Sequence, residues 1–176
     1  AFHVLANDPA IEVDAAQRIQ MIDKLAIASG SIGMAGGQAI DLASVGKTLN
    51  LDELENMHMH KTGALIRASV EMGALCSQGL NPERFAMVSQ YANCIGLAFQ
   101  VQDDILDIES DTETLGKPQG SDIARNKPTY PNLLGLEGAK ETARKLHDEA
   151  IECLQDFDEK ADTLRLIANY IVQRNK

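Results

Sequence analysis

The stretch Phe99-Gln100-Val101-Gln102-Asp103-Asp104-Ile105-Leu106-Asp107 decides the fold. On a helix, four of its polar residues form one continuous stripe because they lie at offsets of zero, three, four and seven: Gln100, Asp103, Asp104 and Asp107. The flanks of that helix are apolar, and a helix that is apolar almost all round is buried against neighbours. Three carboxylates crowded on one face of it repel each other and lose hydration unless a cation meets them. The stretch therefore predicts a buried helix beside a water-accessible cavity that holds a divalent metal.

Composition favours helices and excludes two kinds of partner. Of the 176 residues, 44% are hydrophobic and 24% are charged, as in an ordinary globular domain, while aromatic residues make up only 4%. That balance favours helix over sheet. The net charge of −10 argues against a nucleic-acid partner and against adhesion to anionic lipid, since both need basic surfaces. We expect one all-α domain over residues 1–176.

The cysteines are odd in number and widely spaced. Cys76, Cys94 and Cys153 include no C-x-x-C pair, so they predict reduced thiols with neither a disulfide framework nor a zinc site. No stretch approaches the length of a membrane span, and no secretory signal is visible. These features favour a cytoplasmic protein.

Helix-start signals recur along the chain, whereas strand signals are nearly absent. They comprise a capping box at Asp14 and Gln17, a second at Asn50 and Glu53, and a cap before proline at Asn81-Pro82. Gly63 predicts a kink within the second helix. Residues 110–128 lack apolar periodicity and predict a long loop. The predicted helices cover about 14–42, about 51–79, 82 through the acidic stripe, a short segment after 131, 138–157 and 162–174.

The acidic stripe opens a wider acidic patch. Between Gln100 and Gly116 there are six acids and no Lys or Arg. A solvated helix end is the commonest fate of such a run, but the apolar flanks argue against it for the first three acids. A calcium-binding EF-hand fails, because Thr112 stands where the loop needs Gly and Pro118 where it needs the bidentate Glu. Oxygen ligands on a rigid helix, with room for water and substrate oxygens, favour Mg²⁺ bridging to a phosphate.

Three lysines supply the complementary half of such a site. Lys61 precedes Thr62 and Gly63, and Lys117 and Lys127 lie in the long loop just past the acids. Taken singly, each lysine is typical of an ordinary surface residue. As a set converging on one acidic cavity, they predict an anionic ligand bound through metal and ammonium together.

Two further features leave their roles open. Gly36-Gly37-Gln38 can mark close helix packing without further function. Alternatively, the glycines leave space for a bulky apolar ligand, with Gln38 and Asp41 facing the same hollow. His58 and His60 are two positions apart, so they diverge on a helix and make a poor metal pair.

Five motifs occur in a fixed order: Gly36-Gly37-Gln38-x-x-Asp41, Lys61-Thr62-Gly63, Phe99-Gln100-x-x-Asp103-Asp104-x-x-Asp107, Gly116-Lys117, and the ending Tyr170-Ile171-Val172-Gln173-Arg174-Asn175-Lys176. Together they resemble the trans-isoprenyl diphosphate synthases, most closely the bacterial farnesyl diphosphate synthases. The resemblance covers essentially the whole chain, and the combination is specific where a lone D-D-x-x-D would be weak. It implies an antiparallel helical bundle around a deep central cavity.

The resemblance also implies roles for individual residues. Asp103, Asp104 and Asp107 would be the second aspartate-rich motif, holding Mg²⁺ (or Mn²⁺) on an allylic diphosphate. Catalytic roles would fall to Asp103, Asp104, Lys61, Thr62 and Gln100. Substrate contacts would come from Gln38, Lys61, Thr62, Phe99, Gln100, Lys117, Lys127, Arg174 and Lys176, the last two closing the C-terminus over the site.

A prenyltransferase is the activity that the resemblance implies. It would join geranyl or dimethylallyl diphosphate to isopentenyl diphosphate, giving farnesyl diphosphate and pyrophosphate, and would form a homodimer. Two alternatives stay open: a non-catalytic helical subunit that binds a synthase partner, and a terpene cyclase on the same fold. The intact aspartate motif and the lysines disfavour the first, and the basic Arg174 fits two-substrate chemistry better than the second.

The start of the chain departs from the family pattern. The opening run Ala1-Phe2-His3-Val4-Leu5-Ala6 has no Met and no cap residue, and is typical of the tail of a helix begun earlier. Nothing before Asp8 matches the family's first aspartate-rich motif. We therefore expect a C-terminal portion of the enzyme, which does not turn over alone and does not reveal the product chain length.

Overall fold

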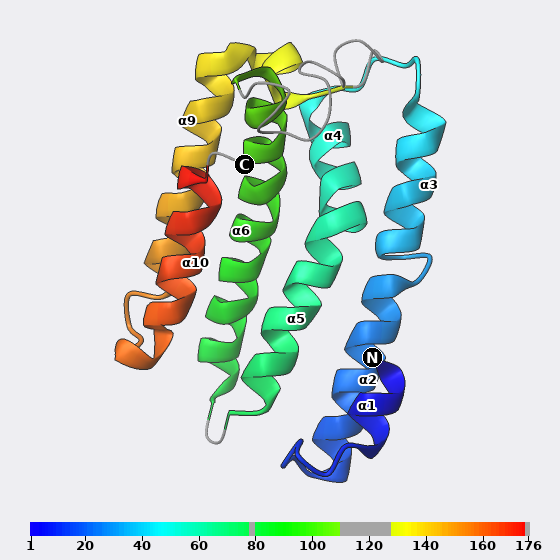
Figure 1. The fold of residues 1–176 in the computed structure, drawn as a ribbon, viewed down its shortest axis with the longest axis vertical. Coiled ribbons are helices and arrows are strands. Elements are labelled where there is room, and N and C mark those ends of the chain that lie inside the picture. Colours follow the sequence, from blue (N-terminus) through cyan, green and yellow to red (C-terminus); the bar gives the residue numbers. More distant parts are fainter. Residues whose placement is uncertain (78–79, 110–127, 175–176) are drawn as a thin grey trace.

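The computed structural model describes residues 1–77, 80–109 and 128–174 (Figure 1). In those ranges every regular element is helical, which confirms the predicted all-α class. The elements are α1 (Phe2–Asn7), α2 (Ala15–Ser29), α3 (Met34–Ser44), α4 (Leu51–His58), a π-helical turn η1 (Met59–Gly63), α5 (Ala64–Leu75), α6 (Pro82–Glu109), α9 (Tyr130–Cys153), a 3₁₀ turn η2 (Glu159–Ala161) and α10 (Asp162–Gln173).

The long helices run up and down beside one another (Figure 1). α6 stands in the middle and packs against α5 on one side and α9 on the other. α2 and α3 pack outside α5 and η1, while α10 contacts both α6 and α9. The chain alternates in direction between α2–α3, α4–α5, α6, α9 and α10, so the predicted antiparallel bundle is confirmed.

Capping boxes begin two helices, as predicted. The Asp14 carboxylate accepts a hydrogen bond from the Gln17 backbone N–H at 2.7 Å, and the Gln17 side chain accepts one from the Asp14 N–H at 3.1 Å. Asn50 and Glu53 form the same reciprocal pair at the start of α4. Each box satisfies two of the N–H groups that a helix start leaves open.

One predicted helix is two in the structure. The prediction of a continuous helix over residues 14–42 is wrong, because the chain turns between Ser29 and Met34. A Cβ at Gly33 would lie 2.2 Å from the Ala28 carbonyl oxygen, so the turn folds back on α2 where only glycine fits. The glycines that looked like tolerated interruptions therefore end one helix and begin the next.

The kink predicted at Gly63 is a π-helical turn. η1 joins α4 to α5 and carries Lys61 and Thr62. π-helical turns are rare in proteins, and many of those that do occur lie at functional sites. α5 then ends at Leu75, before the predicted end of this helix.

The C-terminal helices agree with the prediction in part. The short helix after Pro131 and the next helix form one element, α9, with a break at Gly135, whose φ of 73° favours glycine. α9 ends at Cys153 rather than at 157, whereas α10 nearly matches its predicted range. The predicted loop lies outside the described residues, except for Pro128.

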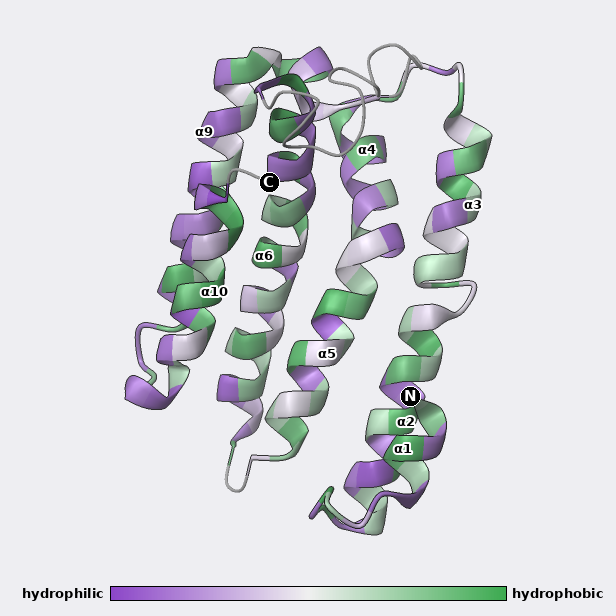
Figure 2. Cartoon of the chain, in the orientation of Figure 1, coloured by the Kyte–Doolittle hydropathy of each residue, from purple (hydrophilic) through white to green (hydrophobic). Residues whose placement is uncertain are grey.

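Two apolar clusters surround α6. One joins α6 to α9 and α10 and includes Tyr91, Ile95 and Leu154. The other joins α4, α6 and α9 and includes Leu54 and Val101. Figure 2 shows apolar residues on every long helix, interleaved with polar ones, as expected for helices that each bury one face. Among the helices of the described ranges, none has the length and apolar character to cross a membrane.

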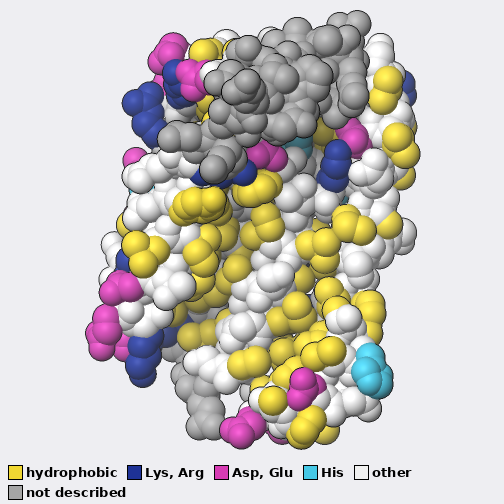
Figure 3. Space-filling view, viewed as in Figure 1, with side chains coloured by type: hydrophobic (Ala, Val, Ile, Leu, Met, Phe, Trp, Pro, Cys, Tyr) yellow, Lys and Arg dark blue, Asp and Glu magenta, His cyan; other side chains and the backbone are white. Residues whose placement is uncertain are grey.

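Large apolar side chains also remain on the outside of the bundle. Figure 3 shows a broad field of hydrophobic side chains across one face of the molecule. α2, α3 and the turn between them expose Ile19, Ile27, Ile32, Met34 and Leu42. These five large apolar side chains therefore stay on the surface of the described bundle instead of joining its core.

Tyr91→Phe tests the α6–α10 core away from the acidic stripe. The Tyr91 side chain is fully buried, and its hydroxyl donates to the Leu164 carbonyl oxygen at 2.7 Å. Removing the hydroxyl deletes a buried hydrogen bond to a carbonyl that keeps its helical partner within α10, so we expect a loss of about 0.5–1.5 kcal/mol in the free energy of unfolding. Denaturant unfolding of the full-length protein measures this loss, and an unchanged midpoint and slope would contradict it.

Candidate active site

The C-terminal half of α6 carries the acidic stripe. Its three carboxylates differ in their exposure to solvent. The Asp103 side chain is 47% exposed. Asp104 and Asp107 are only 9% and 1% exposed. Asp103 therefore faces the surface, while the other two face the interior of the protein.

Arg174, the residue just after α10, folds back onto Asp103. Its guanidinium forms an ion pair with the Asp103 carboxylate and donates to the Phe99 carbonyl oxygen at 3.1 Å. The same guanidinium lies 4.1 Å from the centroid of the Phe99 ring, a cation–π contact. Gln102 holds the tail by donating to the Arg174 carbonyl oxygen at 3.3 Å. Three residues predicted for one site, Phe99, Asp103 and Arg174, thus lie together.

Asp104 holds the start of α9. One of its carboxylate oxygens accepts a hydrogen bond from the Tyr130 backbone N–H at 2.9 Å. Tyr130 is the first residue of α9, whose first N–H groups have no partner inside the helix. A carboxylate there also interacts favourably with the positive end of the helix dipole. Asp104 therefore fixes α9 to α6 beside Asp103.

Lys61 is held in η1 by Asp41 of α3. The Lys61 Nζ lies 2.7 Å from an Asp41 carboxylate oxygen, and both groups are partly buried. Thr62, the next residue, is half-buried, whereas Gln38 is exposed on α3. Gln38 and Asp41 were predicted to face the same hollow. Of these two, Asp41 forms an ion pair with Lys61, the candidate catalytic lysine.

Glycines let η1 approach the helices on both of its sides. A Cβ at Gly37 of α3 would lie 2.1 Å from the Lys61 backbone nitrogen. A Cβ at Gly96 of α6 would lie 3.1 Å from the Cα of Gly63. The close-packing interpretation of the glycine pair is therefore confirmed at Gly37, and α3 and α6 together fix the backbone that carries Lys61.

His58, a residue without a predicted role, lies where these elements meet. It ends α4, is buried, and stacks on the Tyr130 ring with the two centroids 5.9 Å apart. Burial above all, and the nearby Lys61 ammonium to a smaller extent, lower the pKa of His58 to about 4, against weaker opposing effects of Gln100 and Asp41. The ring is therefore neutral at pH 7. Its position three residues before Lys61 was the available sequence signal, because residues at that spacing share a helix face.

The carboxylates fit a hard divalent cation in part. Aspartate oxygens are ligands that Mg²⁺ prefers, and the accessible Asp103 can provide one in exchange for Arg174. Asp104 and Asp107 lie behind it in the interior. Within residues 1–77, 80–109 and 128–174, no three His, Cys, Asp or Glu side chains converge closely enough to hold a metal. Metal binding by all three aspartates stays a prediction.

The described site residues gather at two neighbouring places on the bundle. Phe99, Asp103 and Arg174 form the first, and Lys61 with Asp41 forms the second. Gln100 connects them, because it lies three residues before Asp103 on α6 and its carboxamide is near enough to the His58 ring to raise the pKa of that ring. Three other predicted contacts, Lys117, Lys127 and Lys176, lie outside the described residues.

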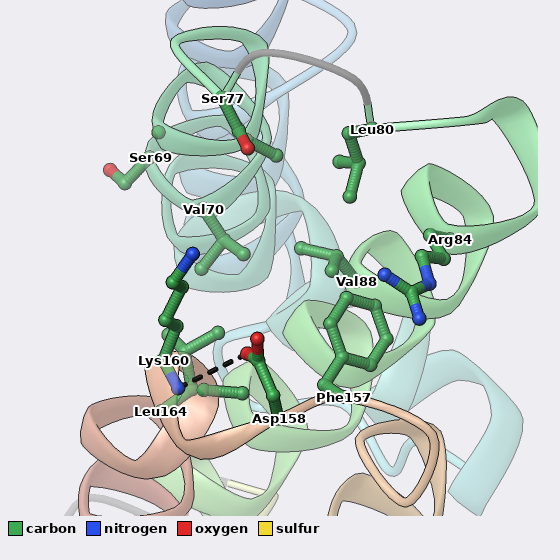
Figure 4. A pocket seen from close by; sticks show the side chains of 13 residues that line it. Ser69, Val70, Ser77, Leu80, Arg84, Val88, Phe157, Asp158, Lys160 and Leu164 are labelled. Atoms are coloured by element: carbon green, nitrogen blue, oxygen red, sulfur yellow. Dashed lines mark hydrogen bonds between the residues drawn. The ribbon is translucent and has the colours of Figure 1, made fainter.

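A cavity of about 620 Å³ lies away from this site (Figure 4). It is lined by the end of α5, the start of α6 and the segment leading into α10, including Val70, Val88 and Phe157. Fifteen residues of α6 separate Val88 from Asp103, a distance of about 22 Å along a helix. The chemistry-bearing residues are therefore at the other end of α6 from the cavity.

Comparison with known proteins gives one family. The family model described as polyprenyl synthetase matches residues 4–170 of the chain. The farnesyl diphosphate synthase of Escherichia coli K12 is 52% identical over 179 residues, covering 100% of this chain and 60% of that protein. The chain thus spans about three fifths of the length of this relative.

Two solved structures share the fold. An FPP/GFPP synthase from Zymomonas mobilis, solved in its apo form, is 40% identical with a TM-score of 0.83, over 97% of this chain and 56% of that one. A geranyltransferase from Helicobacter pylori, solved in complex with magnesium and isoprenyl diphosphate, is 33% identical with a TM-score of 0.80, over 97% and 55%. Both matches cover nearly all of the present chain.

Proposed function

The chain belongs to the polyprenyl synthetase family, and from that premise we propose that the protein is a prenyltransferase. It joins an allylic diphosphate, geranyl or dimethylallyl, to isopentenyl diphosphate and releases farnesyl diphosphate and pyrophosphate. The 52% identity to a farnesyl diphosphate synthase supports this reaction. The structural observation that carries the proposal is the meeting of Phe99 and Asp103 of α6 with Arg174, which follows α10. There an accessible carboxylate, a cation and an aromatic ring lie close to Gln100.

Ionisation of the allylic carbon–oxygen bond is the demanding step. The bonding electron pair leaves with the diphosphate, so negative charge grows on the leaving group as the allylic cation forms. Fixed positive groups stabilise this transition state more than the ground state. We assign that role to Lys61, whose ammonium is held in place by Asp41, with Thr62 and Gln100 donating hydrogen bonds to the diphosphate.

Mg²⁺ at this site would add Lewis-acid stabilisation of the leaving diphosphate. Asp103 is the carboxylate placed to bind it directly, with Asp104 one residue and Asp107 four residues further along α6. Mn²⁺ takes the same oxygen ligands and is the alternative ion. Asp103 would hold the ion, and Arg174 would then be free of its ion pair and available to the isopentenyl diphosphate.

Apolar walls protect the allylic cation, because water would capture it. The Phe99 ring and the apolar flank of α6 provide such a wall beside the charged residues. The double bond of isopentenyl diphosphate then supplies the electron pair of the new carbon–carbon bond. A proton leaves the adjacent carbon for an oxygen of the released pyrophosphate, which closes the balance of atoms and charge.

We propose that the protein is a cytoplasmic homodimer, as the sequence led us to expect. A homodimer is supported by the exposed apolar side chains of α2 and α3, which a second copy can cover. A cytoplasmic location is supported by Cys76, Cys94 and Cys153, which are free thiols. A single domain over residues 1–176 remains part of the same proposal.

Incubation of the full-length protein with geranyl diphosphate, radiolabelled isopentenyl diphosphate and Mg²⁺ tests the proposed function. We expect label in farnesyl diphosphate, identified as farnesol after phosphatase treatment, and no product when a chelator replaces the metal. A cyclic hydrocarbon formed from the allylic diphosphate alone would indicate a terpene cyclase instead. Turnover only after addition of a second synthase would indicate a non-catalytic subunit.

A further inference from the structure

His58 has two ring nitrogens that are buried without a partner. The residue is 7% exposed at the end of α4, and among the described residues neither Nδ1 nor Nε2 meets a group in hydrogen-bond geometry. Leaving a buried donor or acceptor unpaired costs about 1–3 kcal/mol, so nearly all such groups in folded proteins have partners. A neutral imidazole has one donor and one acceptor to offer. The ring is therefore equipped to orient a neighbour.

Groups of the candidate active site surround this ring. Lys61 of η1, Gln100 of α6 and Asp41 of α3 each lie close enough to shift its pKa, the first downward and the other two upward. The upward effect of Gln100 comes from its side-chain amide facing the ring. Among the described residues neither ring nitrogen has a hydrogen bond, so the amide lies beside the ring without a bond to it.

Packing alone does not account for an imidazole at this place. The ring lies 15° from parallel to the Tyr130 ring, whose own hydroxyl is buried without a partner among the described residues. A phenylalanine would keep that stacking contact and would remove two unpaired nitrogens. In a purely structural role, His58 would then be the less stable choice.

We propose that His58 is a positioning residue of the prenyltransferase site, which holds the Gln100 carboxamide toward the allylic diphosphate beside Lys61. The inference rests on the proposed function and adds a residue to it. The stacking on Tyr130 fixes the plane of the ring, and Asp104 fixes Tyr130 through its backbone N–H at 2.9 Å. A chain of contacts thus runs from the aspartate stripe through Tyr130 and His58 to Gln100.

His58→Phe in the full-length protein separates a positioning role from a packing role. We expect kcat and kcat/KM for geranyl diphosphate to fall together by roughly 10- to 100-fold, the effect of misplacing a group that acts in the transition state. We expect Tm to stay the same or rise, since the unpaired nitrogens are gone. His58→Asn, which keeps one donor and one acceptor, should retain more kcat than His58→Phe despite a lower Tm.

Tyr91→Phe is the matched control, because it too removes a buried polar group from an aromatic side chain. Its hydroxyl bonds to Leu164, in the core between α6 and α10. We expect the opposite pattern from this variant: a lower Tm and an unchanged kcat. If kcat simply follows Tm across the His58 and Tyr91 variants, the positioning role is wrong.

A double-mutant cycle with Gln100→Ala tests the route of the effect. If His58 acts through Gln100, His58→Phe costs little further kcat once Gln100 is alanine. An equal fold-loss in both backgrounds, or an unchanged kcat for His58→Phe alone, would overturn the inference while the prenyltransferase assignment stands. A wild-type protein that forms no prenyl product would instead overturn the proposed function, and this inference with it.

Discussion

Replacing Asp103 by alanine in the full-length protein lowers kcat by at least about 10²-fold, the usual cost of losing a group that stabilises charge in the transition state. Among the three aspartates of the stripe, Asp103 has the most exposed side chain, whereas Asp104 and Asp107 are buried. The substitution removes the proposed metal ligand and also frees Arg174 from its ion pair. Steady-state kinetics at saturating Mg²⁺ and both substrates measure the change.

Asp162→Ala is the control for this experiment. Asp162 also forms an ion pair with an arginine, Arg165, at 2.6 Å, but at the start of α10 and with its side chain 63% exposed. An exposed pair contributes about 0–1 kcal/mol, so we expect this variant to keep its kcat. Asp103→Ala with wild-type kcat would remove the aspartate from the mechanism.

Gly37→Ala is expected to damage both stability and activity. The added Cβ would lie 2.1 Å from the Lys61 backbone nitrogen and 2.5 Å from its Cα. A contact of that kind with backbone cannot be relieved by a side-chain rotation, so α3 and η1 must move apart. Overpacking typically costs about 1–3 kcal/mol or more, and we expect the upper end of that range. The shift of η1 also moves Lys61, so kcat should fall even at temperatures where the variant is folded.

Gly73→Ala provides the comparison, because the same change is made on α5 in open space. Apart from its chain neighbours and its own helix backbone, no atom of the described residues lies within 4 Å of a Cβ at Gly73. Glycine in a helix costs about 0.5–1 kcal/mol relative to alanine, so Gly73→Ala should stabilise the protein and leave kcat unchanged. Denaturant unfolding measures the stability of both variants, and steady-state kinetics measure their kcat. If Gly37→Ala unfolds at the same denaturant concentration as the wild type, the close approach of α3 to η1 is not as described.

The helical architecture was predictable from local chemistry. Asp14 and Asn50 cap their helices through bonds within three residues, and such short-range signals need no knowledge of the fold. The central place of α6 followed from its apolar flanks, and Val101 and Ile105 on them are indeed buried. The break near Gly33 was missed, because glycine is tolerated in helices and only contact with Ala28 shows that the turn requires it.

The candidate site was predictable in its residues but not in their partners. Spacing along one helix placed Asp103, Asp104 and Asp107 on one stripe, yet their unequal burial depends on α9 and α10, which lie far away in sequence. Arg174 was expected near the site only through the family resemblance, and its contact with Phe99 is a tertiary event. The interior position of His58 likewise depends on Tyr130, a contact across 72 positions that no local pattern contains.

A crystal structure of the full-length protein with Mg²⁺ and a non-hydrolysable geranyl diphosphate analogue tests the central assignment most directly. We expect Mg²⁺ about 2.0–2.1 Å from an Asp103 oxygen and in contact with the diphosphate, with Lys61 on the same diphosphate and Arg174 released from Asp103. A diphosphate and metal bound elsewhere, with the Asp103–Arg174 ion pair intact, would contradict it.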